Sequence, residues 1–142
     1  MTAEDVIQML ALEPHPEGGW YRQTWEADGA GRASGTSIYF LLKAGERSHW
    51  HRVDATEIWH HYAGAPLRLR ISETEQGPVE TQKLGPDLRS GARPQVIVPK
   101  HFWQSAAAAP DGGWALVGCT VSPGFRFEGF ELALPDFDIP SD

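Results

Sequence analysis

The sequence has little that would suit an extracellular, membrane-bound or nucleic-acid-binding protein. Cys119 is the only cysteine, so no disulfide can form within the chain, and its apolar surroundings predict a small core residue. There are 12 lysines and arginines against 19 aspartates and glutamates, so the net charge of −7 offers no basic field for nucleic acid. Glu4 and Asp5 stand where a signal peptide would be positive, and no hydrophobic run approaches a membrane span. We therefore expect a soluble cytoplasmic protein with no nucleic-acid or membrane partner.

Turn-forming and aromatic residues are abundant in the 142-residue chain. Its 15 glycines, 11 prolines and six tryptophans favour many short strands over long helices. The exception is the N-terminus, where Thr2 can cap a helix over residues 2–12 and Pro14 stops it. Together these features predict an all-β fold with one short N-terminal α-helix.

The predicted strands follow one another at near-regular spacing, which is typical of a jelly roll or closed sandwich. Around a histidine-containing segment at 45–51, they cover 20–25, 36–42, 57–62, 67–72, 79–84, 95–98, 104–108, 114–121 and 125–134, the last broken near Gly129. We expect one domain over 1–142, with a barrel at about 20–134 and an acidic, loosely ordered tail at 135–142.

His49 and His51 are separated by one residue, and Glu57 follows six residues later. Side chains at i and i+2 of a strand share a face, and Glu57 falls near the start of the next strand. Two imidazoles and a carboxylate on one inner wall form a facial triad, which suits Fe, Mn, Zn or Ni with open positions for substrate. The alternatives are a pocket that works without metal, a hydrogen-bonded structural pair at His51 and Glu57, and a loop-capping role for His49.

The spacing of Gly45, His49, His51, Glu57 and Gly64 resembles the first motif of the cupin superfamily, in which two histidines and a glutamate bind metal inside a jelly-roll barrel. The second cupin motif is replaced here by Pro99-Lys-His-Phe-Trp-Gln104, which puts Gln104 at the last ligand position. A neutral amide is a weak metal ligand, so the resemblance implies His49, His51 and Glu57 as metal ligands with Gln104 as a weak fourth.

Further segments extend the resemblance over nearly the whole chain. They are His15-Pro-Glu-Gly-Gly-Trp-Tyr-Arg22, Ile38-Tyr-Phe-Leu-Leu42, Ser48-His-Trp-His-Arg52, Glu57-Ile-Trp-His60, Trp103-Gln104 and Gly124-Phe-Arg-Phe-Glu128. Together they are similar to the small family called cupin superfamily 5, a domain of unknown function. The resemblance implies a cupin double-stranded β-helix barrel, a homodimer, and a distant similarity to dTDP-4-dehydrorhamnose 3,5-epimerases. In that family the histidine followed by arginine, here His51-Arg52, is the more dependable of the pair.

Several other residues are candidates for the pocket. Alternation places Trp59 and His61 on the face of Glu57 and His60 on the other face, but a bulge would exchange His60 and His61. The two glycines after Glu17 permit close approach of a ligand or partner chain, so His15 or Glu17 can reach a barrel mouth. The full set of expected ligand-binding residues is His15, Glu17, Arg22, Trp59, His60, His61, Trp103 and Gln104.

The function expected from these residues is an enzyme acting on a small polar metabolite, with sugar nucleotides as the first class to test. In one mechanism a divalent metal polarises a carbonyl or activates water. In the other mechanism, a histidine such as His51 removes an acidic proton next to a carbonyl, and a tyrosine such as Tyr39 or a second acid returns one. The expected catalytic residues are His51, Glu57 and Tyr39. No organic cofactor is expected. A non-catalytic binding or storage module is the alternative function.

Overall fold

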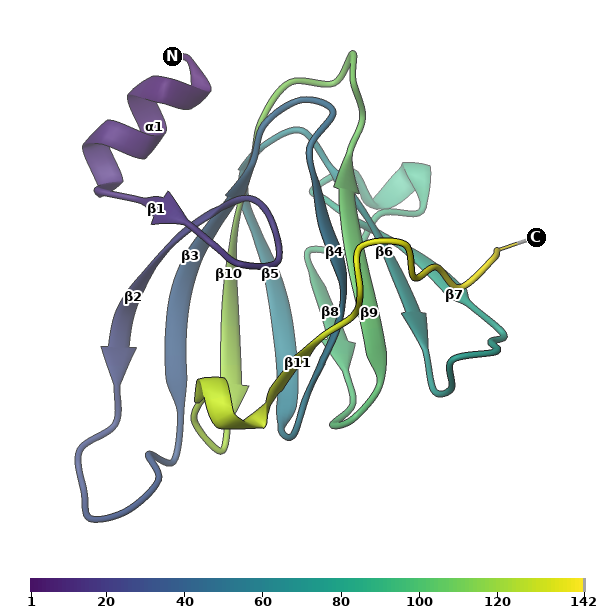
Figure 1. Ribbon diagram of the computed structural model, residues 1–142. Coiled ribbons are helices and arrows are strands. Elements are labelled where there is room, and N and C mark those ends of the chain that lie inside the picture. The colour runs from purple at the N-terminus through teal and green to yellow at the C-terminus, as the bar shows by residue number, and fades with distance from the viewer. Residues whose placement is uncertain (142) are drawn as a thin grey trace.

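The computed structural model describes residues 1–141, which form two antiparallel sheets facing each other (Figure 1). One sheet has the strand order β1-β2-β3-β10-β5-β8 and the other β11-β4-β9-β6-β7. The strands are β1 (Glu13–Pro14), β2 (Trp20–Glu26), β3 (Thr36–Leu42), β4 (Arg47–Val53), β5 (Thr56–Gly64), β6 (Leu67–Ser72), β7 (Glu80–Leu84), β8 (Gln95–Val98), β9 (Trp103–Ala108), β10 (Ala115–Ser122) and β11 (Phe130–Leu132). The helices are α1 (Ala3–Leu10) and the 3-10 turns η1 (Leu88–Ser90) and η2 (Phe127–Gly129). The expected jelly-roll barrel with one short helix is confirmed.

The N-terminal helix α1 begins at the expected cap. Asp5 N–H donates to Thr2 Oγ1 at 3.1 Å while Thr2 N–H donates to Asp5 Oδ2 at 2.8 Å, which satisfies two donors that the helix itself leaves free. The helix ends at Leu10, earlier than expected, because Ala11 adopts a left-handed conformation (φ 55°) and closes it. No helix in residues 1–141 is long and apolar enough to cross a membrane.

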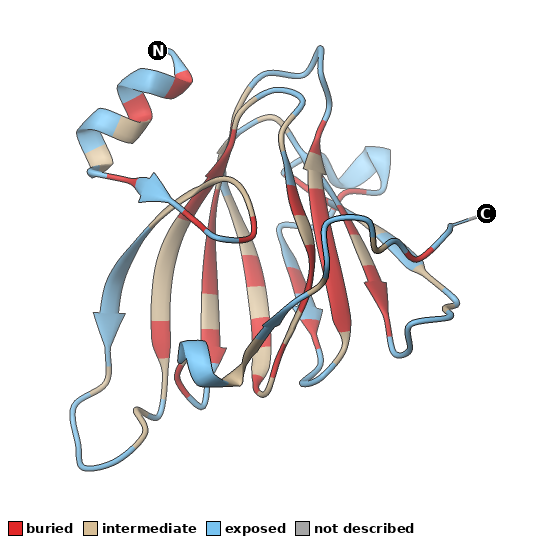
Figure 2. Cartoon of the chain, viewed as in Figure 1, coloured by how far each residue is buried: buried red, intermediate tan, exposed pale blue. Residues whose placement is uncertain are grey.

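The main core lies between the two sheets and follows the period-2 pattern of the strands (Figure 2). Leu67 and Leu69 of β6 are buried against Phe40 of β3 and Trp59 of β5. Cys119 is buried in the same cluster, as expected for a small core residue. This packing joins β3, β5 and β10 to β6, and β3, β4, β5 and β10 carry most of the cavity described below.

The C-terminal quarter differs from the expectation. Residues 125–134 form η2 and the short strand β11, where one broken strand was predicted. The tail was expected to be loosely ordered, but it packs against the sheet as far as Ile139. The Ile139 side chain is fully buried against Trp50 and Trp103 on the outer side of the five-stranded sheet. Asp138 also accepts a hydrogen bond from Trp50 Nε1 at 2.8 Å. Two large indoles on an outer face need cover, and the tail supplies it.

Candidate functional site

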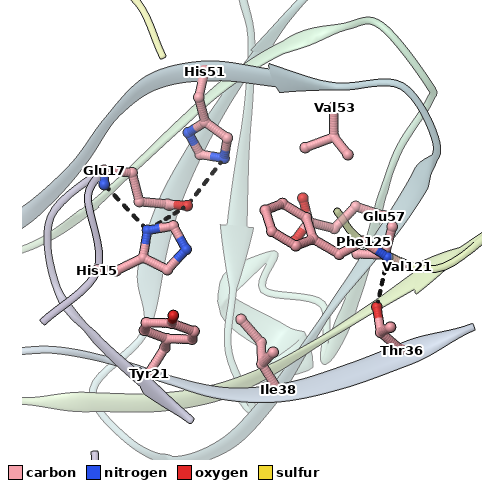
Figure 3. A pocket seen from close by; sticks show the side chains of 10 residues that line it. All are labelled: His15, Glu17, Tyr21, Thr36, Ile38, His51, Val53, Glu57, Val121 and Phe125. Atoms are coloured by element: carbon pink, nitrogen blue, oxygen red, sulfur yellow. Dashed lines mark hydrogen bonds and ion pairs between the residues drawn. The ribbon is translucent and has the colours of Figure 1, made fainter. Parts of the chain in front are cut away.

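A cavity opens between the two sheets at the end where the loop joining β1 to β2 passes over β4 (Figure 3). Its interior is small, with a volume of about 30 Å³, and the wider empty space of about 380 Å³ includes open solvent at the mouth. The ten side chains that line it are His15, Glu17, Tyr21, Thr36, Ile38, His51, Val53, Glu57, Val121 and Phe125. Apolar walls therefore surround a few converging polar groups.

The loop at 15–19 brings His15 and Glu17 into the cavity because its glycines allow a tight turn. Gly18 has a φ of +105°, and a Cβ there would overlap the carbonyl oxygen of Arg47. The turn is closed by hydrogen bonds from His15 N–H to the Gly19 carbonyl (2.9 Å) and from Gly18 N–H to the His15 carbonyl (3.0 Å). The close approach expected for a ligand or partner chain is thus made by the protein's own strand β4.

Glu17 connects the loop to both histidines of the cavity. Ser48 Oγ donates to its Oε2, while its Oε1 lies 3.5 Å from His51 Nε2 and 3.3 Å from His15 Nδ1. Burial raises the pKa of Glu17 to about 8, although the Ser48 hydrogen bond favours the ionised form. Near neutral pH the Glu17 carboxyl group is therefore mostly protonated.

His51 is held in one tautomer by the backbone. Its Nδ1 lies 2.8 Å from the His49 carbonyl oxygen, which can only accept, so Nδ1 carries the ring proton and Nε2 keeps a lone pair. Burial lowers the pKa of His51, and it lowers that of His15 to about 3 with a further contribution from His51. Both rings are therefore neutral at neutral pH.

Glu57 approaches the cavity from the wall opposite Glu17 (Figure 3). Trp59 Nε1 donates to Gln104 Oε1 at 2.8 Å, which turns the Gln104 amide so that its Nε2 donates to Glu57 Oε1, also at 2.8 Å. Burial raises the pKa of Glu57 to about 7, and the charge of Glu17 adds to the effect, while His51 and the Gln104 hydrogen bond oppose it. The carboxyl group is thus poised to gain or lose a proton near neutrality.

The predicted metal triad is not brought together. Between Ser48 and His51, strand β4 holds one more residue than its partner β9, and this bulge turns His49 away from the cavity. His49 Nε2 instead lies 2.8 Å from the Leu134 carbonyl oxygen. The Gln104 amide, the expected fourth ligand, is bonded to Glu57 and Trp59. Across residues 1–141 no three His, Cys, Asp or Glu side chains are placed to hold a metal ion, so the residues present do not fit the expected metal.

Other expected site residues lie away from the cavity. Tyr39 is on the outer face of its sheet because its neighbours Ile38 and Phe40 point inward, and Tyr21 is the tyrosine that lines the cavity. Arg22 is exposed and bonds the Leu10 carbonyl at 3.4 Å. Trp103 is buried beneath the C-terminal tail.

The question of His60 and His61 is answered by the pairing of β5 with β10. The register shift falls at Tyr62, beyond both histidines, so the plain alternation holds for them. His60 faces outward and lies 3.0 Å from Thr120 Oγ1. His61 shares the inner face but lies 2.9 Å from the Ala65 carbonyl at the far end of the strand, and neither residue lines the cavity.

The sequence analysis missed Tyr21, Ser48 and Phe125 as parts of the site. Alternation along β2 puts Tyr21 and Arg22 on opposite faces, so at most one of them can enter the cavity. Arg22 was predicted, and Tyr21 is the one that lines the cavity. Ser48 and Phe125 gave no such signal, since the first depends on the β4 bulge and the second lies in a turn after β10. Trp59 is on the inner face of β5, as predicted, but it does not line the cavity. It acts on the site by donating a hydrogen bond to Gln104.

Comparison with protein families and solved structures relates this geometry to known proteins. The family model described as Cupin superfamily (DUF985) matches residues 4–133. A crystal structure of a protein from Shewanella oneidensis is 44% identical with a TM-score of 0.87, covering 94% of this chain and 85% of that one. A hypothetical protein from Leishmania major is 32% identical with a TM-score of 0.87, covering 94% and 88%.

More distant structures share the fold alone. Oxalate decarboxylase from Bacillus subtilis is 17% identical with a TM-score of 0.64, covering 84% of this chain and 29% of that one. No curated protein matches the chain.

Proposed function

The chain belongs to the DUF985 family of the cupin superfamily, and we propose that it is an enzyme. In this proposal the enzyme moves a proton within a small polar metabolite that binds in the cavity. The observation that supports the proposal most directly is a pair of buried carboxyl groups, Glu17 and Glu57, on opposite walls of one cavity (Figure 3). Two acid–base groups that face one cavity suit the removal of a proton at one position and its return at another.

In the proposed reaction Glu57 is the base. Its carboxylate takes a proton from the carbon next to a carbonyl group, and the electron pair of the broken C–H bond moves toward the carbonyl oxygen. Glu17 then gives its proton to the substrate, either directly or through His51 Nε2, 3.5 Å away. The resting state returns when Glu57 loses its proton to solvent and Glu17 takes one up from solvent. Gln104 and Ser48 are positioning residues because each binds one of the two carboxyl groups.

Sugar nucleotides are the first substrate class to test, and the lining narrows how they would bind. None of the ten lining residues is a lysine or arginine. A diphosphate inside the cavity would face two acids without a cation to pair with it. The proposal therefore places an uncharged, carbonyl-bearing portion of the substrate in the cavity and any phosphate outside it.

The test is proton exchange with solvent. Wild-type protein is incubated in D₂O with a panel of sugar nucleotides and small keto or aldehyde compounds, and proton NMR follows the signals next to the carbonyl. We expect exchange that is lost in Glu57→Gln and kept in His61→Gln, a matched change outside the cavity. The rate should be highest between about pH 7 and about pH 8, where Glu57 is ionised and Glu17 still protonated.

Binding without exchange for every compound would contradict the enzyme proposal. The cavity would then belong to the alternative class, a non-catalytic binding or storage module. An exchange rate equal in Glu57→Gln and wild type would exclude Glu57 as the base.

A further inference from the structure

The ring of His15 is fixed in orientation by its surroundings. Its side chain is 4% exposed, and the ring packs edge-on against Tyr21, with centroids 4.5 Å apart, and against Phe40 and Phe130 at 6.0 and 5.9 Å. Three aromatic neighbours leave the imidazole little freedom to flip. Its two nitrogens therefore have separate and stable roles.

The backbone determines which nitrogen of His15 carries the proton. Glu17 N–H donates to His15 Nδ1 at 3.1 Å, so Nδ1 must present a lone pair. In the neutral ring the proton is then on Nε2. This is the opposite tautomer to that of His51, whose Nδ1 donates to the His49 carbonyl.

His15 Nε2–H points toward the cavity and is not used by the folded chain. Figure 3 shows this nitrogen on the side of the ring that faces the cavity, while Nδ1 faces Glu17. Within residues 1–141 no hydrogen bond to it is found, although the side chain is almost wholly buried. Among the described residues only Trp103 Nε1 is a buried side-chain atom without a partner, so His15 Nε2 is reached from the cavity, and a ligand there can accept its hydrogen bond.

We propose that His15 is a catalytic residue that binds the substrate's carbonyl oxygen by donating a hydrogen bond from Nε2 while remaining neutral. The substrate class is then an uncharged compound with a carbonyl acceptor for His15 and a neighbouring donor for His51 Nε2. This inference rests on the proposed function, because the carbonyl that His15 binds is the one beside which Glu57 removes a proton.

The assignment is consistent with the chemistry of the reaction. As the C–H electron pair moves toward the carbonyl oxygen, negative charge develops there, and a fixed N–H donor stabilises it. The ring keeps its proton throughout, so the proton balance still involves only Glu57, Glu17 and solvent. Burial lowers the pKa of His15 to about 3, so the ring stays neutral over the working pH range.

The first test reads the tautomers directly and needs no substrate. In ¹⁵N-histidine-labelled protein, long-range ¹H–¹⁵N spectra distinguish a protonated ring nitrogen from one with a lone pair. We expect His15 to show protonated Nε2 from pH 8 down to pH 5, and His51 to show protonated Nδ1 at pH 8 and pH 7. His61, whose Nε2 donates to the Ala65 carbonyl at 2.9 Å, provides the reference shift for the His15 form. A His15 ring protonated on Nδ1, or doubly protonated at pH 6, would overturn the inference.

The second test measures binding of 2-pyrrolidinone, an uncharged lactam whose carbonyl accepts and whose N–H donates. We expect saturable shifts at His15 Nε2 and His51 in wild type, binding at least about tenfold weaker in His15→Phe, and near-normal binding in His15→Gln, whose amide can still donate. His60→Phe, at a histidine that faces away from the cavity, is the matched control and should bind the lactam normally.

Two outcomes would overturn the assignment: no binding of the lactam by wild type, or equal binding by His15→Phe. Folding of each variant is checked by its backbone amide spectrum, and His15→Gln keeps the test valid if His15→Phe is unfolded. Neither measurement depends on turnover, so a failure of the exchange experiment alone would remove the proposed reaction and leave the binding role of His15 standing.

Discussion

At the scale of single residues, the cavity is defined by which groups hold protons. Glu17 and Glu57 are buried carboxyl groups with raised pKa values, and His15 and His51 are buried imidazoles with lowered ones. Burial in a low-dielectric interior opposes charge on all four groups, and it moves acids and bases in opposite directions. At pH 7 the two imidazoles are therefore neutral and Glu17 is mostly protonated, which leaves Glu57 as the group that changes charge near neutrality.

The protonation of Glu17 predicts how stability depends on pH. Its pKa is about 8 in the folded protein and 4.5 when unperturbed, so its contribution to stability is present below pH 4.5 and is lost as pH rises through about 8. Glu17→Gln mimics the protonated acid and should gain stability relative to wild type between pH 6 and about pH 8, by at most about 1.4 kcal/mol per pH unit, with no further gain at higher pH. Urea unfolding at pH 6, 7, 8 and 9 measures this.

The matched control for this prediction is Glu26→Gln, a change at an exposed carboxylate. Its stability relative to wild type should stay nearly constant over the same range. Parallel curves for Glu17→Gln and wild type would mean that Glu17 is ionised in the folded protein, and the acid in the proposed reaction would then have to be another group.

At the scale of elements, two local irregularities build the site. The bulge in β4 brings Ser48 and His51 to the inner face although they are three residues apart. The glycines at 18 and 19 let the loop lie directly on β4, where Glu17 accepts a backbone hydrogen bond from His49 at 2.7 Å. Regular strands would have placed His49 in the cavity and left Glu17 outside.

The loop predicts a specific sensitivity at Gly18. Gly18 and Gly31 both have a positive φ, which an alanine adopts only with strain. In Gly18→Ala the new Cβ would also overlap the Arg47 carbonyl oxygen, whereas in Gly31→Ala it would lie in open space. Both variants bear the backbone strain, but only the first also has the overlap. Gly18→Ala should therefore be less stable than Gly31→Ala by about 1–3 kcal/mol in urea unfolding. Equal stability would show that the loop can move off β4 without cost.

The C-terminal tail gives a second prediction for an element. Ile139 is fully buried against Trp50 and Trp103, so Ile139→Ala should leave a cavity and destabilise the protein by about 2–5 kcal/mol. Leu134→Ala, at a side chain that is 74% exposed, should change stability by less than about 0.5 kcal/mol. Thermal and urea unfolding compare the two. A neutral effect at Ile139 would show that the tail is dispensable.

At the scale of the whole molecule, the outer face of the six-stranded sheet is notably uncharged. The outward residues of strands β3, β10 and β5 and of the edge strand β8 include Tyr39, Ile58, His60, Tyr62 and Ile97. No lysine, arginine, aspartate or glutamate faces outward from these strands within the described chain. Tyr62 is 51% exposed and Ile97 58% exposed. Large exposed apolar groups on a neutral face are typical of an interface.

We propose that two copies of the chain form a homodimer through this face. A neutral surface does not repel its own copy, and a two-fold contact would cover the same residues on both chains. Sedimentation velocity should give a dimer for wild type and a monomer for Ile97→Lys. Leu88→Lys, at an equally exposed side chain on η1, is the matched control and should stay dimeric. A monomeric wild type would contradict the proposal.

The sequence by itself determined the fold and most of its strands. Thr36–Leu42, Leu67–Ser72 and Gln95–Val98 begin and end where predicted, because a strand with one buried face imposes a period-2 pattern that can be read directly. The segment at 15–19 and residues His51, Glu57 and Gln104 were also identified as site candidates, and the structure places them in or beside one cavity.

Only the tertiary structure decided the chemistry of the site. The extra residue in β4 is visible only against its partner β9, and it removes His49 from the expected triad. The tautomers of His15 and His51 depend on a backbone N–H and a carbonyl, which the identity of a side chain does not reveal. The pKa values of Glu17 and Glu57 also depend on the folded chain, because burial and the neighbouring polar groups set them.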